Sequence, residues 1–197
     1  MIGRDIDKLI KIIAKLPALG PRSARRIVLA LLKSRETALK PLIESLGSVA
    51  DNIKTCEVCG NFDTVSPCSI CTANGKEESL LCVVQDVSDL WAMEKVASYK
   101  GKYHVLGGIL SALDGVAPED LNIENLLFRV KKENIEEVIL ALPATVDGQI
   151  TAHYILSKLK EEDVKVTTLA QGIPMGAELD YMDEGTLQLA LTSRKSL

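Results

Sequence analysis

Four cysteines in a short window are the residues best suited to chemistry. Cys56, Cys59, Cys68 and Cys71 follow the spacing Cys-x2-Cys-x8-Cys-x2-Cys. Each Cys-x-x-Cys hook can grip a metal ion from one side, and together the hooks supply four thiolates in the tetrahedral arrangement that zinc prefers. Four protein ligands leave no open position for water, so we expect one structural Zn²⁺ per chain rather than a catalytic one.

The loop between the two hooks is too short to bury a core of its own. Metal binding would therefore supply its folding energy, on the order of 10 kcal/mol. The alternative is a pair of disulfides, which are rare in cytoplasmic proteins. The fifth cysteine, Cys82, stands apart in an apolar run, and we interpret it as a buried core thiol.

A basic hairpin precedes the cysteines. The stretch 16–26, Leu-Pro-Ala-Leu-Gly-Pro-Arg-Ser-Ala-Arg-Arg, joins two short amphipathic helices and resembles a helix-hairpin-helix DNA-binding motif. Backbone N–H groups at the second helix start, near Gly20, can hold a phosphate, and Arg22, Arg25 and Arg26 stand in its first turns. The motif usually has Gly-hydrophobic-Gly at its turn; here Ala18 replaces the first glycine, which costs backbone freedom. The alternative is a purely structural hairpin.

Charge is divided unevenly along the chain. The formal net charge of the 197 residues is −4, which alone argues against nucleic acid. Residues 1–55 nevertheless hold 11 Lys/Arg and 5 Asp/Glu, a net charge of +6, while residues 56–197 carry −10. A polyanion would be drawn to the first part and repelled by much of the second. The other interpretation of the basic part is a set of solvated helices.

Hydrophobic spacing indicates the elements that must position these groups. Apolar positions predict helices over 5–15 and 22–34 and a third after Pro41. Further along, the pattern predicts strands near 81–85, 103–107, 137–142 and 164–169, with helices over 88–98, 122–133 and 149–161. Strands that alternate with helices indicate a mostly parallel sheet covered on both faces.

Nothing in the sequence suggests a membrane. No apolar run reaches the roughly 18 residues of a spanning helix, and the charged N-terminus lacks the apolar core of a secretory signal. We therefore expect a cytoplasmic protein.

The order of these motifs resembles the RecR recombination-mediator family. A basic hairpin is followed by a four-cysteine knot and a strand that begins Leu81-Cys-Val-Val. The stretch 103–121, from Tyr-His-Val-Leu-Gly-Gly to Pro-Glu-Asp-Leu, is similar to the family signature. So are the stretches 171–187 and 190–194, and the resemblance spans nearly the whole chain.

The resemblance implies an α+β multidomain fold with an α/β Toprim domain, as found in topoisomerases and primases, and a helical C-terminal tail. The implied regions are a helix-hairpin-helix for DNA binding and oligomerisation at 1–54 and a four-cysteine zinc finger at 55–72. The Toprim domain follows at 79–172, and a C-terminal subunit contact at 173–197. It also implies a nucleoid-associated mediator that binds single-stranded, double-stranded and gapped DNA. Such a mediator works with RecO and RecF to load RecA, as a dimer or a tetrameric ring.

The positions of the Toprim metal ligands argue against catalysis. Toprim enzymes hold magnesium with an acidic residue after the first strand and an Asp-x-Asp pair after a later one, because magnesium prefers hard oxygen ligands. Here the first position is Gln85, and the pair reads Asp147-Gly-Gln149. As a strand neighbour, Asp86 is expected to point to the opposite face. We therefore predict no enzyme; a magnesium-dependent nuclease or primase and a protein-binding adaptor are the alternatives.

Three further residues are interpreted as structural. His104 in a predicted strand and His153 on a predicted helix are expected to be satisfied structural histidines. Trp91, the single tryptophan, is expected in the core rather than as a platform for stacked bases.

Overall fold

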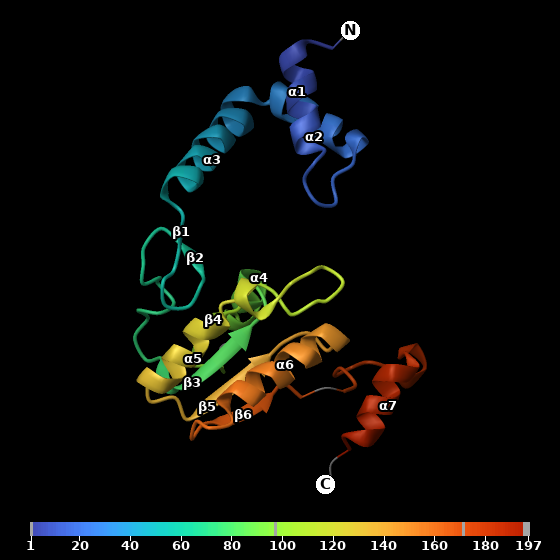
Figure 1. Ribbon diagram of the computed structural model, residues 1–197. Coiled ribbons are helices and arrows are strands. Elements are labelled where there is room, and N and C mark those ends of the chain that lie inside the picture. Colours follow the sequence, from blue (N-terminus) through green and yellow to red (C-terminus); the bar gives the residue numbers. More distant parts are fainter. Residues whose placement is uncertain (1, 97, 171, 195–197) are drawn as a thin grey trace. The chain divides into compact units, whose positions relative to one another are not determined.

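The computed structural model describes residues 2–96, 98–170 and 172–194 and divides into two compact units, 1–53 and 54–197 (Figure 1). All regular elements of the first unit are helices. It contains α1 (Arg4–Ile13), α2 (Pro21–Lys33), a π-helical turn (Arg35–Leu39) and α3 (Lys40–Asn52). Apolar side chains of α1 and α2 meet in a small core at Ile10, Ala24 and Val28.

The second unit opens with a small antiparallel pair, β1 (Lys54–Thr55) and β2 (Phe62–Asp63), in the cysteine region. A parallel sheet follows, in the order β4-β3-β5-β6. Its strands are β3 (Glu77–Val84), β4 (Gly101–Val105), β5 (Glu137–Ala141) and β6 (Lys165–Thr168). The helices are α4 (Val87–Glu94), α5 (Ile123–Lys132), α6 (Val146–Leu159) and α7 (Glu184–Thr192), with 3-10 turns at Pro118–Asp120 and Leu179–Tyr181.

The central strand β3 is buried on both faces from Leu81 to Val84, as the alternation of strands and helices predicts. Leu81 and Val83 of β3 face a core shared with α5 and α6, whereas Cys82 and Val84 face a second core with α4. Successive side chains of a strand point to opposite faces, so a strand covered on both sides is apolar at every position. Cys82 is fully buried, as expected, and burial raises the pKa of its thiol to about 12.

None of the described helices is long and apolar enough to cross a bilayer. The expected helical tail is confined to α7, because the described part of 173–183 consists of turns and extended chain.

Side chains also satisfy backbone groups of β4. The Tyr99 hydroxyl donates to the Lys102 carbonyl oxygen at 2.9 Å, and the buried Arg129 guanidinium donates to the Tyr103 carbonyl oxygen at 2.8 Å. Arg129 also pairs with Glu133 at 3.0 Å. A buried guanidinium would be costly if it were unpaired, so these contacts hold α5 against the strand.

His104 is fully buried on β4, and its contacts fix its tautomer. Nε2 lies 2.7 Å from the Asn122 carbonyl oxygen, which can only accept, so Nε2 carries the proton. Nδ1 lies 3.4 Å from Nη1 of Arg129, which can only donate. Burial lowers the pKa of His104 to about 4, with the Arg129 charge acting in the same direction. His104 is therefore a satisfied structural histidine.

We predict that folding stability falls as the pH drops from about 6.5 towards 4, because the unfolded chain takes up a proton that neutral, buried His104 does not accept. His104 makes its full contribution to the free energy of unfolding above pH 6.5. Below that pH, the contribution falls by about 1.4 kcal/mol per pH unit. Urea unfolding of wild type and His104→Gln at pH 7, 6 and 5 should show a shallower pH dependence in the variant. Equal slopes would contradict the assignment.

Candidate metal centre and nucleic-acid interface

The four thiols of the two hooks converge on one point. Their sulfur atoms all lie within 4.8 Å of one another. The Cys59–Cys68 and Cys56–Cys71 sulfur pairs are 3.5 and 3.9 Å apart. Four sulfurs bound tetrahedrally at about 2.3 Å would be separated by about 3.8 Å, so the two short sulfur pairs are already close to the spacing that a zinc ion needs. Within the described residues, this is the one cluster of three or more His, Cys, Asp or Glu side chains placed to share a metal.

Backbone hydrogen bonds orient the hooks. The Gly60 N–H donates to the Cys56 carbonyl oxygen at 2.9 Å, which closes the first hook, and the Cys68 N–H points at the Cys56 sulfur at 3.3 Å. Such outer contacts hold ligands in place and stabilise the thiolate form. Hydrogen bonds within the cluster, led by the one from the Cys71 thiol, lower the pKa of Cys59, whereas the same pairing raises the pKa of Cys71.

Asp63 braces the loop between the hooks. Its carboxylate accepts hydrogen bonds from the backbone N–H and the hydroxyl of Ser69, at 2.8 and 2.7 Å, and from the backbone N–H of Thr64. These bonds, led by the one from the Ser69 N–H, lower the pKa of Asp63 to about 2. The loop thus keeps its shape through local polar contacts in addition to the metal site.

The cysteine region is docked on the sheet. The Val105 N–H at the end of β4 donates to the Cys59 carbonyl oxygen at 2.7 Å. Gly60 has φ +79°, and a Cβ there would lie 3.1 Å from the Val105 Cβ, so glycine permits this close approach. The expectation of a core Trp91 is wrong: its side chain is half exposed, and its indole N–H donates to Asn61 Oδ1 at 2.9 Å. No local sequence signal marks this contact, because its partners are 30 residues apart.

The basic hairpin is built on the small core shared by α1 and α2. The turn between them contains Ala18 with φ +61°, a left-handed conformation that costs a non-glycine residue about 1–2 kcal/mol. The energetic cost of the left-handed backbone therefore falls on the position where the motif usually has glycine. α2 begins after Gly20, with Pro21 in its first turn and no side chain capping its N-terminus.

The three arginines of the hairpin lie beside this uncapped helix start. Arg22, Arg25 and Arg26 are exposed on α2, whereas Ala24 between them is fully buried. The free N–H groups of a helix N-terminus carry partial positive charge, and exposed guanidinium groups add full charges next to them. The arrangement can bind a phosphate through backbone and side chains together.

The positions that would hold magnesium in a Toprim enzyme lie at one edge of the sheet. Val84 pairs with Ala141, so Gln85 after β3 and the loop after β5 leave the sheet side by side, and Asp147 stands in the first turn of α6. The expected placement of Asp86 on a strand is wrong. Asp86 is the N-cap of α4, and its carboxylate accepts from the Val87 N–H, which is a structural use of that group.

Comparison with known proteins gives a consistent picture over the whole chain. Four family models match in succession: RecR helix-hairpin-helix at residues 6–50, RecR four-cysteine zinc finger domain at 53–73, Toprim domain at 79–170, and RecR C-terminal at 172–195. The chain is 55% identical to recombination protein RecR of Hyphomonas neptunium, over 99% of this chain and 97% of that protein. It is 53% identical to that of Paramagnetospirillum magneticum, over 99% of each chain.

We predict that removing the metal with a chelator shifts Trp91 emission to longer wavelength. Asn61 lies between the hooks, so loss of their geometry releases the indole N–H into water. Fluorescence and metal content should be followed together in wild type, Cys71→Ala and Cys82→Ala. Cys71→Ala should lose zinc and show the shift, whereas Cys82→Ala should keep one zinc per chain. A metal-free wild type with unchanged emission would contradict the coupling.

Proposed function

The chain belongs to the RecR family of recombination proteins, and we propose that it acts as a non-catalytic, DNA-binding mediator of recombinational repair. The observation that carries the proposal is the uncapped start of α2, flanked by exposed Arg22, Arg25 and Arg26. Contacts of this kind go to the phosphate backbone and carry no sequence information. They suit a protein that must recognise gaps and single strands of any sequence.

The mediator would hand DNA over to other proteins rather than alter it. Working with RecO and RecF, it would promote loading of RecA on single-stranded DNA at gaps. The finger, at 55–72, would keep its zinc as a structural ion, and the Toprim region, at 79–172, would serve as a scaffold. Gln85 and Gln149 support this, because neutral amides are poor ligands for a catalytic magnesium ion.

Exposed apolar surface supports self-association. All the apolar residues of α3 that follow Pro41 lie outside the core, and five large ones are 41–60% exposed, namely Leu42, Ile43, Leu46, Val49 and, just beyond the helix, Ile53. A patch of this kind usually marks an interface. We propose that α3 packs against a second copy, within a dimer or a tetrameric ring. The C-terminal segment 173–197, where Met175 and Tyr181 are highly exposed, would supply a second subunit contact.

We predict that Arg22→Ala with Arg26→Ala removes most DNA affinity while the fold survives, because both side chains are exposed. The slope of log K against log salt should fall by about 1.8 on duplex DNA, since each lost phosphate contact contributes about 0.9. Lys100→Ala with Lys160→Ala, which removes the same charge from the second unit, is the control. Unchanged affinity in the arginine variant would overturn the hairpin as the DNA site.

A gel assay of the wild-type protein separates a mediator from an enzyme. Zinc-loaded protein is incubated with end-labelled gapped DNA and magnesium, and the products are resolved on native and denaturing gels across a salt series. A salt-sensitive shift with intact strands supports the mediator. Cut or extended strands would show a nuclease or primase, and the absence of any shift would favour a protein-binding adaptor.

We predict that Leu46→Glu lowers the mass of the assembly in light scattering, because a charge buried in an apolar interface is strongly unfavourable. Leu113→Glu, at a leucine that is 98% exposed in the second unit, is the matched control and should leave the mass unchanged. An unchanged mass for Leu46→Glu would contradict the assignment of α3 as a subunit contact. The wild-type mass distinguishes a dimer from a tetramer.

A further inference from the structure

α1 carries a row of cations on the side opposite its core. Arg4, Lys8 and Lys11 recur at intervals of four and three residues, and Lys15 follows four residues later in the turn that continues the helix. At 3.6 residues per turn, these four positions fall within an arc of about 60°. The core-facing Ile10 lies on the other side of the helix, so the row is turned away from the packing that holds α1 to α2.

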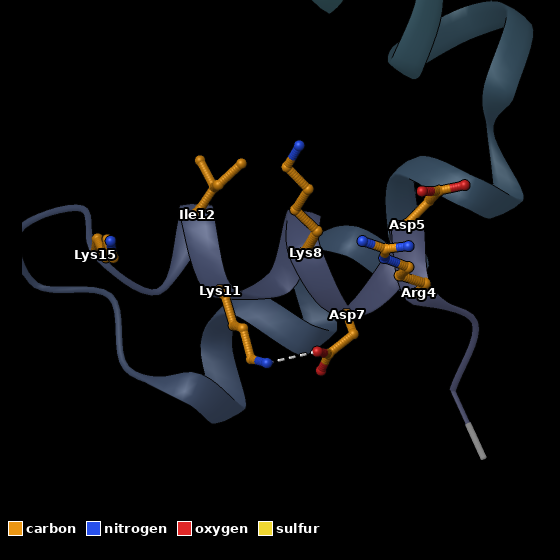
Figure 2. A pocket seen from close by; sticks show the side chains of 7 residues that line it. All are labelled: Arg4, Asp5, Asp7, Lys8, Lys11, Ile12 and Lys15. Carbon is orange, nitrogen blue, oxygen red and sulfur yellow. Dashed lines mark ion pairs between the residues drawn. The ribbon is translucent and has the colours of Figure 1, made fainter.

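Few carboxylates neutralise the positive charges of the row. Lys11 pairs with Asp7 at 2.7 Å, and both side chains are largely exposed. Within the described part of the chain, Arg4, Lys8 and Lys15 have no carboxylate within ion-pair distance. Figure 2 shows these side chains around a shallow hollow on α1, whose lining also includes Asp5 and Ile12. The surface keeps a clear excess of positive charge.

The row leads into the hairpin. Lys15 is followed directly by the turn that reaches Gly20 and the start of α2, and α1 and α2 share one core, so the row and the hairpin arginines belong to one packed piece. From Arg4 to Lys15 the helix rises about 16 Å. This length matches about five base pairs of duplex, at 3.4 Å per phosphate on one strand.

We propose that the exposed face of α1 is a second nucleic-acid contact, which binds a stretch of phosphate backbone on the side of the helical pair opposite Arg22 and Arg26. The proposal rests on the proposed DNA-binding function and adds a second surface to it. Lys15 is the nearest residue of the row to the hairpin along the chain, and Arg4 marks its far end. The contact is independent of sequence, because ammonium and guanidinium groups at helical spacing read only the repeating charge of the backbone.

Phosphates fit this face better than an acidic protein surface does. The row lies on a single helix with one apolar residue, Ile12, exposed within the hollow, whereas a protein interface has an apolar centre with charges at its rim. Flexible cations around a shallow, open hollow suit a regularly charged chain that releases counterions on binding.

The test compares salt dependence in four full-length, zinc-loaded proteins. Besides the wild type, Lys8→Gln with Lys15→Gln removes two members of the row, Arg22→Ala with Arg26→Ala removes the hairpin contacts, and Lys100→Gln with Lys160→Gln is the charge-matched control. For the row variant we expect the slope of log K against log salt to fall by about 1.8 on duplex and about 1.4 on single strands. The control should keep the wild-type slope.

Asp7→Asn provides a test of opposite sign. It removes the partner of Lys11, so the slope should rise by up to about 0.9 on duplex DNA. All substituted side chains are wholly or partly exposed, and circular dichroism and zinc content verify the fold.

The outcomes separate the two proposals. If the hairpin variant loses affinity and the row variant keeps the wild-type slope, the α1 contact is overturned and the hairpin site stands. If the row variant lowers the slope and the hairpin variant binds normally, the α1 contact is supported and the hairpin assignment fails. If neither variant differs from the control, both are overturned, and the row is then a solvated helix face.

Discussion

Four thiols held at one point are the constraint on which the finger and its contacts with the sheet depend. The finger has almost no apolar core besides its own cysteines, and its two strands are only two residues long each. A metal therefore does what a core does elsewhere: it fixes Gly60 and Asn61 where they meet β4 and α4. Only Ile53 separates α3 from β1, so the chain of the helical unit enters the second unit at this metal-held segment.

The sequence predicts those parts of the fold whose causes are local. Apolar runs predict each strand of the sheet within a few residues, and the clearest case is β3, whose last four residues are apolar and buried. The exposed start of β3 at Glu77 and the pair β1–β2 have no such run and are not predicted. Asp86 and Trp91 are misplaced for another reason. A cap and an indole hydrogen bond depend on the path of the chain around them, which spacing does not encode.

The candidate site shows the same division. The cysteine cluster is predicted because the ligand spacing reflects the geometry of a single ion, and the structure brings all four thiols together. The energetic cost of a left-handed backbone at Ala18 is also predicted, because it depends only on the backbone conformation of that residue. The cation row on α1 has the spacing of any solvated helix face. It gains meaning only when the core of α1 and α2 shows that the row and the hairpin are one piece.

β4 lies at an edge of the sheet, and edge strands are natural templates for pairing with a strand from another molecule. Two groups on the open side of this edge are already paired. The Tyr103 carbonyl oxygen accepts from Arg129, and the Val105 N–H donates to Cys59. A finger that loses its metal would uncover the last of these groups. The metal-held finger therefore also covers the end of an edge strand that could otherwise pair with another chain.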